Sequence, residues 1–389
     1  MYIPQDNVNH PLYIICIVFN PVRFKRRWKL YRDFQAQVRN AGAILITVEA
    51  AFGDREYALE DHAPAWKHGA QNSFVPTNDG RPLHTDGIEP QYRSHGPAPI
   101  PVSARMPDSR NFQDYIKLRV RDNSEVWLKE NMCNIAIQHL PEDAKYVAFV
   151  DADVHFTRPD WVSETLHALQ HYDVVQMFSV AYQMDSRYEA MQASYGFAYC
   201  HVNGAPVKPD PGDYYLPAEK WHGKSNLWHT GFAWAWRVSA LHDVGGLIEH
   251  GILGAGDNHM SRCLVGRCED SLNSALTEGY KRRVRQWQAL CEQHIQRNIG
   301  YVQGTIYHYY HGRLFNRNYA NRWKLLIKHQ FDPDYDLKKD ARGVIALTDG
   351  KIGLRDDIRR YFRSRDEDST DIYPGDGQLL GTPPGELPW

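Results

Sequence analysis

The chain alternates between short runs that are apolar on both faces and longer segments in which apolar residues recur with helical spacing. Residues 12–19, LYIICIVF, form the first run, which stops at Asn20 and Pro21. Such a run is typical of a strand buried on both faces, as in a parallel sheet. Residues 22–42 then predict a helix with Gly42 as its C-cap, because large apolar side chains recur every three or four positions: Phe24, Trp28, Tyr31, Phe34 and Val38. Residues 43–53 predict a second buried strand that ends near Glu49, which completes a βαβ unit.

The alternation resumes after a long break. Residues 60–112 are rich in Pro, Gly, His and Asn, which is typical of a functional or disordered loop. Residues 122–143 predict a helix that starts with Asp122 and Glu125 at capping-box spacing. A strand over 145–153, a helix over 158–172 and a strand over 173–180 follow. This order predicts an α/β fold: a doubly wound, mostly parallel central sheet.

Paired carboxylates follow the strand over 145–153. Asp151 and Asp153 stand at its carboxyl end, where ligands bind in doubly wound sheets. Carboxylates after a buried run are costly unless a cation compensates them, and Mg²⁺ and Mn²⁺ prefer oxygen ligands. The alternative is a solvated strand end, where Asp is common.

Composition and charge narrow the class of protein. The 389 residues are 42% hydrophobic with a formal net charge of −2, which does not favour a nucleic-acid binder. The six cysteines are scattered without a C-x-x-C pair, so we expect neither a disulfide framework nor a zinc site. The first apolar run is too short to span a membrane. We therefore expect a soluble, cytoplasmic protein.

The C-terminal part is less regular. Residues 226–246 are aromatic and Gly-rich, 251–266 carry a Gly-rich turn before a helix-like run, and 304–323 predict a strand followed by a basic loop. The residues after about 365 are polar and rich in Pro and Gly, which predicts a flexible tail. We divide the chain into a main domain over 1–330, a helical extension over 331–370 and the tail over 371–389.

Four segments in this order resemble metal-dependent glycosyltransferases of the GT-A fold, over roughly residues 12–325. They are VFNPVRFKRR, FVDADVHF, the block from Thr230 to Met260, and YHYYHGRLFNR. The third resembles the β-1,4-galactosyltransferase and polypeptide N-acetylgalactosaminyltransferase families. The resemblance implies a nucleotide-sugar donor, best a UDP-sugar, and Mn²⁺ or Mg²⁺ as cofactor.

The resemblance also implies roles for single residues. Asp151 and Asp153 would hold the metal, with His311 as the third ligand and His308 as its close rival. Arg313 and Arg317 would stabilise the leaving diphosphate. Asp257 would be the base of an inverting reaction. Gly256 replaces the Glu of the family's usual Glu-Asp pair, and the alternative for Asp257 is a helix cap.

Further donor contacts are implied at strand ends and on the helix before the Asp-X-Asp strand. They are Phe19, Asn20, Arg23 and Glu49 in the first group and Lys129 and Asn134 in the second, with Trp234 to stack on a sugar.

The sequence specifies the acceptor substrate less closely than the donor. The layout also resembles viral and microbial glycosyltransferases of the base J and TET-associated type, which implies a 5-hydroxymethylpyrimidine in DNA as acceptor and, for a viral protein, a host cytoplasm. The basic runs at 23–32 and 281–285 and the loop 60–112 would contact phosphates, or else be solvated faces. A polysaccharide or protein acceptor stays open. The rival classes are a haloacid-dehalogenase-like phosphatase and a non-catalytic binding module.

Overall fold

The computed structural model describes residues 10–59, 114–204, 228–317 and 322–370. The predicted loop over 60–112 and tail over 371–389 lie outside these ranges, so neither prediction is tested.

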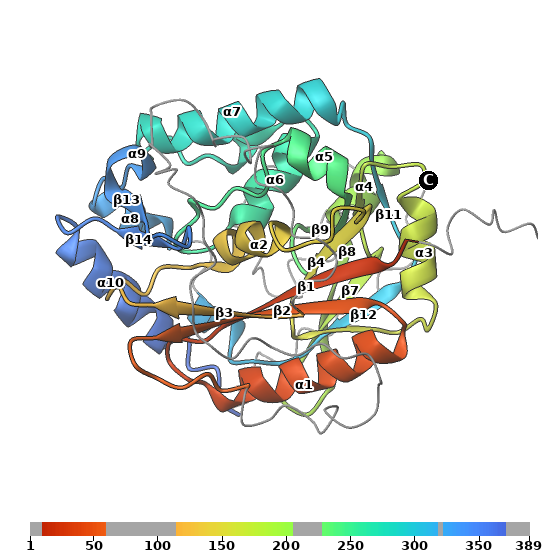
Figure 1. The fold of residues 1–389 in the computed structure, drawn as a ribbon, viewed down its shortest axis with the longest axis horizontal. Coiled ribbons are helices and arrows are strands. Elements are labelled where there is room, and N and C mark those ends of the chain that lie inside the picture. The colour runs from red at the N-terminus through yellow and green to blue at the C-terminus, as the bar shows by residue number, and fades with distance from the viewer. Residues whose placement is uncertain (1–9, 60–113, 205–227, 318–321, 371–389) are drawn as a thin grey trace, which may run out of the picture.

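The centre of the molecule is a seven-stranded, mostly parallel sheet, as predicted (Figure 1). Only β10 runs antiparallel to its neighbours, β4 and β6. In spatial order the strands are β11 (Ile299–Tyr301), β6 (Val174–Gln176), β10 (Ala233–Arg237), β4 (Tyr146–Val150), β1 (Leu12–Phe19), β2 (Ile44–Phe52) and β3 (Tyr115–Val120). The α/β class is therefore confirmed.

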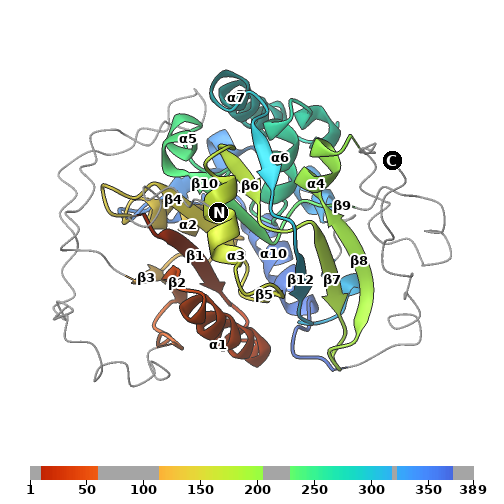
Figure 2. The ribbon, with the colours of Figure 1, turned by 90° about the vertical axis from the view of Figure 1, so that its right-hand side faces the viewer.

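Helices cover both faces of this sheet, which explains why β1 is apolar throughout (Figures 1 and 2). On one face Leu12, Ile14 and Cys16 pack in the same cluster as α1 (Lys25–Asn40) and α3 (Trp161–Ala168). On the other face Tyr13 and Ile15 pack with α2 (Lys129–Ile137), α5 (Val238–Asp243) and α7 (Glu278–His294). Alternate side chains of one strand thus enter two separate apolar clusters.

A second, five-stranded sheet was not predicted. Its order is β5 (Val154–Phe156), β12 (Thr305–His308), β7 (Val180–Met184), β8 (Ala190–Gly196) and β9 (Trp228–His229). The strand expected over 173–180 is divided, because β6 joins the central sheet and β7 joins this one. The register of β12 on β5 places His308 opposite Val154, directly after Asp153. This pairing brings two distant segments of the sequence to one site.

The remaining elements are mostly short helices. They are α4 (Phe197–Val202), α6 (Gly256–Leu264), α8 (Trp323–Lys328), α9 (Pro333–Asp336), α10 (Ile352–Ser364), the 3-10 turns Cys268–Ser271 and Leu314–Arg317, and the hairpin of β13 (Leu337–Lys339) and β14 (Ile345–Leu347). Residues 365–370 belong to the polar segment for which flexibility was expected from about residue 365. They are described, and Asp368 bonds to the start of α1, whereas the predicted tail boundary at residue 371 is not tested.

Two boundaries differ from the prediction, and one agrees. Helix α2 begins at Lys129 without a side-chain cap, because Asp122 instead accepts hydrogen bonds from the backbone N–H and hydroxyl of Ser124 in a turn. Strand β2 continues to Phe52, so Glu49 lies inside the strand. Gly42 follows α1 with a φ of +77°, the left-handed geometry expected after a helix end.

All six cysteines are buried free thiols. Within the described ranges, no helix is both long and apolar enough to cross a lipid bilayer.

Candidate active site

A cavity lies where the chain leaves β1 and β4 at their carboxyl ends. Many of the predicted site residues line it: Phe19, Lys129, Asp151 and Asp153 from the N-terminal half, and Asp257, His308, His311 and Arg317 from the C-terminal half. The topology therefore brings the Asp-X-Asp pair and the two later segments to one place.

Asp153, His308 and His311 form a compact cluster in the cavity wall. One ligand atom from each lies within 4.8 Å of the others. The Nε2 atom of His311 is 2.8 Å from Asp153 Oδ2, and that of His308 is 3.4 Å from Asp153 Oδ1. Among the described residues, Asp153 Oδ1 is buried without a hydrogen-bond partner. Both candidate histidines thus point at the same carboxylate.

The contacts of the His308 ring, unlike those of His311, indicate which nitrogen carries the proton. His308 Nδ1 lies 2.5 Å from the amide oxygen of Gln183, an acceptor, so Nδ1 is the donor and Nε2 keeps its lone pair. His311 Nε2 lies 2.8 Å from Arg317 Nη2, which only donates, and 2.8 Å from Asp153 Oδ2, which only accepts when ionised, so the tautomer of His311 in the absence of a cation is not fixed by these two contacts. The Nε2 atoms of both rings and the Asp153 carboxylate therefore converge.

The electrostatics of the cluster favour an ionised Asp153 and a neutral His308. Burial would raise the pKa of Asp153, but the contacts with His308 and His311 outweigh it and hold that pKa well below its usual range. Burial lowers the pKa of His308 to about 4, so the ring is neutral at neutral pH. An ionised carboxylate beside the neutral imidazole of His308 is a set that fits a divalent cation.

Asp151 has a different partner from Asp153. It forms an ion pair with Lys129, at the start of α2. Burial raises the pKa of Asp151 and Lys129 opposes that rise, while the charge of Asp151 raises the pKa of Lys129 against its burial. Asp151 is therefore the carboxylate of the pair that a protein cation already compensates.

Asp257 lies in the first turn of α6 and reaches the cavity from the opposite segment. Its Oδ1 accepts a hydrogen bond from the backbone N–H of Asn258, while Ala255 holds the N-cap position. Its Oδ2 packs so closely on Gly231 that a Cβ there would lie 2.4 Å away. A side chain at residue 231 would therefore displace the Asp257 carboxylate from this position.

Glu130 is a buried carboxylate in the same wall that the sequence reasoning missed. It is 5% exposed and packs on Gly256, where an added Cβ would lie 2.7 Å from Glu130 Oε1. Burial raises its pKa to about 7. Gly256 departs from the Glu-Asp pair of the family resemblance, and a carboxylate from α2 lies against that glycine.

Other predicted residues do not line the cavity. Asn20 bonds to the backbone of Phe24, and Arg23 stacks on Trp28. The Glu49 carboxylate accepts hydrogen bonds from the backbone N–H groups of Ala58 and Leu59 and from the Tyr115 hydroxyl. These three side chains hold local structure around β1 and β2.

Three more predicted residues, Asn134, Trp234 and Arg313, also do not line the cavity. Asn134 bonds to the backbone of Leu247 and to Glu249. The indole of Trp234 donates to the carbonyl of Thr230.

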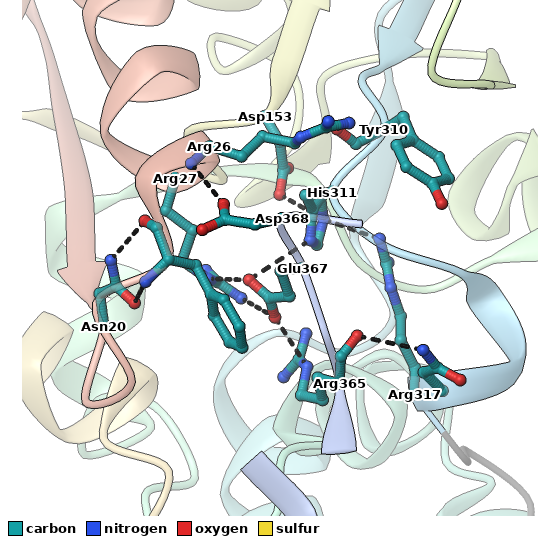
Figure 3. Close-up of polar contacts among 12 residues, drawn as sticks. Asn20, Arg26, Arg27, Asp153, Tyr310, His311, Arg317, Arg365, Glu367 and Asp368 are labelled. Atoms are coloured by element: carbon teal, nitrogen blue, oxygen red, sulfur yellow. Dashed lines mark hydrogen bonds and ion pairs between the residues drawn. The ribbon is translucent and has the colours of Figure 1, made fainter. Parts of the chain in front are cut away.

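A buried carboxylate next to the cluster, Glu367, was also missed. It pairs with Arg27 and Arg365 and lies 3.8 Å from His311 Nδ1 (Figure 3). Burial opposes its ionisation, but the two guanidiniums outweigh burial and hold the pKa of Glu367 well below its usual range. No local pattern identifies it, because Arg27 and His311 are distant from it in the sequence. The basic run around Arg27 was a partial signal.

The basic run at 281–285 is largely used in ion pairs, and one arginine of the run at 23–32 is used in the same way. Arg27 bonds to Glu367, Arg282 and Arg283 pair with Asp334, and Arg285 pairs with Glu269. Their described contacts are therefore internal to the protein.

Comparison with known proteins adds little beyond the geometry. No protein-family model matches the chain, and no curated protein matches it. Among solved structures, it is similar to the catalytic domain of Drosophila β1,4-galactosyltransferase 7 in complex with xylobiose, at 9% identity and a TM-score of 0.27, over 68% of this chain and 63% of that one. The match thus spans less than two thirds of that domain.

A mutant of the same Drosophila enzyme, in complex with manganese, UDP-Gal and xylobiose, matches at 9% identity and a TM-score of 0.33, over 89% of this chain and 98% of that one. At these identities and TM-scores, the structural likeness does not identify a function for this chain.

Proposed function

We propose that this chain is a metal-dependent glycosyltransferase of the GT-A type, which transfers a hexose from a UDP-sugar to an acceptor hydroxyl. The observation that carries the proposal is the convergence of Asp153, His308 and His311 in a cavity at the carboxyl ends of the strands. Ligands bind at this edge of α/β sheets. This cavity is lined by residues of FVDADVHF, of YHYYHGRLFNR and of the Gly-rich block from Thr230 to Met260, which are segments of the family resemblance.

The donor atoms favour Mn²⁺ over Mg²⁺. Two imidazole nitrogens accompany the carboxylates, and Mg²⁺ prefers an all-oxygen octahedral shell. When bound, the metal neutralises charge on the leaving diphosphate. Lys129, Arg317 and Arg322 line the same cavity and add positive charge for an anionic donor.

Asp257 is proposed as the general base. Its carboxylate takes the proton of the acceptor hydroxyl while that oxygen bonds to the anomeric carbon of the sugar. The bond from this carbon to the diphosphate breaks, and UDP leaves with the electron pair. Attack on the face opposite the leaving group makes the reaction inverting. The support is the position of Asp257 in the wall, held by Gly231 and Asn258.

For the acceptor we propose a 5-hydroxymethylpyrimidine of DNA, on the basis of the family resemblance. Indole rings of Trp127, Trp228 and Trp323 line the cavity, and an aromatic wall suits a flat base or the apolar face of a sugar. A polysaccharide or protein acceptor is the alternative. The internal ion pairs of the basic runs favour this alternative.

The test is UDP release from a panel of UDP-sugars with Mn²⁺, with and without DNA that contains 5-hydroxymethylcytosine, with Asp153→Asn as control. Release that needs the modified DNA supports the full proposal. Release that ignores DNA keeps the enzyme class and removes the DNA acceptor. No release from any donor contradicts the proposal. In that case hydrolysis of an aryl phosphate would indicate a phosphatase, and ligand binding without turnover a binding module.

A further inference from the structure

The segment that follows α10, residues 365–368, runs beside the candidate metal site; we name it the C-terminal clasp (Figure 3). Its side chains alternate: Arg365 and Glu367 are buried, whereas Asp366 and Asp368 are exposed. The Asp368 carboxylate accepts hydrogen bonds of 2.9 and 2.8 Å from the backbone N–H groups of Lys25 and Arg26. The clasp is therefore attached to the positive end of α1.

Glu367 turns from the clasp toward the metal site. Its carboxylate is 2% exposed and bonds to Arg27 and Arg365, which compensate its charge. Figure 3 shows it among these two guanidiniums and the ring of His311. The distance from Glu367 Oε2 to His311 Nδ1 is 3.8 Å, within ion-pair range and slightly longer than a hydrogen bond.

His311 needs an acceptor on this side of its ring. Arg317 Nη2 donates toward Nε2, and a bound cation also needs the Nε2 lone pair, so a neutral ring that binds a cation carries its proton on Nδ1. Among the described residues, Nδ1 is buried without a hydrogen-bond partner, and Glu367 is the carboxylate that faces it. His308 has the equivalent arrangement, with Gln183 opposite its Nδ1.

A second, independent contact holds the backbone of His311 against the clasp. Gly312 has a φ of +85°, and a Cβ there would lie 2.8 Å from Glu367 Cα and 2.9 Å from the Arg365 carbonyl oxygen. Two backbones approach this closely only because residue 312 is glycine. The spacing between His311 and the clasp is therefore fixed by the main chain as well as by side chains.

We propose that Glu367 is a positioning residue for His311: its carboxylate accepts a hydrogen bond from the Nδ1–H group and so directs the Nε2 lone pair toward a cation bound beside Asp153. Such an acceptor behind a metal-binding histidine fixes the tautomer and the ring orientation. The identity of the cation in this inference rests on the proposed function. The tautomer of His311 does not depend on that function.

The experiment measures Mn²⁺ binding by calorimetry and the His311 tautomer by NMR on protein with ¹⁵N-labelled histidine. The variants are Glu367→Gln and Asp368→Asn, a matched change in the same clasp that does not contact His311. Loss of the residue that hydrogen-bonds to a metal-binding histidine typically weakens metal affinity about 10–100-fold. We expect that weakening for Glu367→Gln and a change within about 3-fold for Asp368→Asn. The metal-free wild type should show a proton on His311 Nδ1, assigned by loss of its signal in His311→Asn.

Each outcome decides the inference. Equal Mn²⁺ affinity in Glu367→Gln and the wild type overturns it, and so does equal weakening in Asp368→Asn, which would mean a purely structural clasp. If Glu367→Gln does not fold, because two guanidiniums lose their charged partner, Glu367→Asp takes its place in the comparison. The shorter side chain of aspartate keeps the negative charge and withdraws it from His311. If the wild type does not bind Mn²⁺, the proposed function fails, and the tautomer alone decides Glu367: a proton on Nε2 contradicts its role.

Discussion

Glu130→Gln tests whether the buried Glu130 carboxylate in the cavity wall lowers the stability of the folded protein. Glu130 lies in the first turn of α2, 5% exposed and packed against Gly256. Glutamine has nearly the same shape and cannot ionise. The substitution therefore removes the charge and keeps the packing.

The expected magnitude follows from the pKa of about 7 in the folded protein. An unfolded chain has a glutamate pKa of about 4.3, and each unit of difference corresponds to about 1.36 kcal/mol. Because the folded pKa is the higher one, the folded protein binds the proton more tightly, and stability falls as pH rises from about 4.3 to 7. Glu130→Gln should therefore be more stable than the wild type by about 3–4 kcal/mol at pH 8, and by only about 1 kcal/mol at pH 5.

Urea unfolding at pH 5 and pH 8, without divalent metal, measures this difference through the midpoint at constant slope. Glu142→Gln is the control, because Glu142 is exposed in a loop and its change should stay within about 0.5 kcal/mol at both pH values. An advantage of Glu130→Gln that is the same at pH 5 and pH 8, or a less stable variant at pH 8, would refute the reasoning. A stabilised variant with lower transfer activity would indicate that the carboxylate is retained for function.

Three further predictions concern the proposed chemistry. Asp153→Asn should weaken Mn²⁺ binding by at least about 10-fold in calorimetry, because it removes the charge that both imidazoles face, whereas Asp160→Asn on the surface should not. Asp257→Asn should lower kcat about 10²–10⁴-fold with Mn²⁺ affinity unchanged, and near-normal transfer would exclude it as the base. Gly231→Ala should lower kcat at least about 10-fold by displacing the Asp257 carboxylate, at a cost of about 1–3 kcal/mol in urea unfolding; Gly350→Ala, with open space around it, is the control, and full activity in Gly231→Ala would contradict the packing.

Local patterns predicted the parts of the fold that local patterns determine. The double-sided apolar run of β1 and the helical spacing of α1 are properties of contiguous residues, and both elements appear where expected. The second sheet was missed because its strands are short and pair across long separations, as β12 does with β5 and β7. Glu49 was misplaced because apolar residues continue past it, and its carboxylate is satisfied by backbone N–H groups and Tyr115.

The candidate site divides in the same way. Asp151 and Asp153 were identifiable because they end a buried strand, and His308 and His311 because a basic motif follows them. Glu130 and Glu367 carry no such signal, since the first lies on a helix face next to Lys129 and the second in a polar segment typical of tails. Their burial depends on Gly256 and on Arg27, which only the tertiary structure brings near.

The C-terminal clasp has a consequence for the order in which the protein is made. Synthesis delivers Asp153, His308 and His311 before Glu367, and domains generally fold as they emerge at about 5–20 residues per second. For roughly several seconds a nascent chain would hold all three proposed metal ligands without the carboxylate proposed to orient one of them. Maturation of the metal centre would then be a late event in biogenesis, and a single proteolytic cut between α10 and the clasp would return a finished molecule to that immature state.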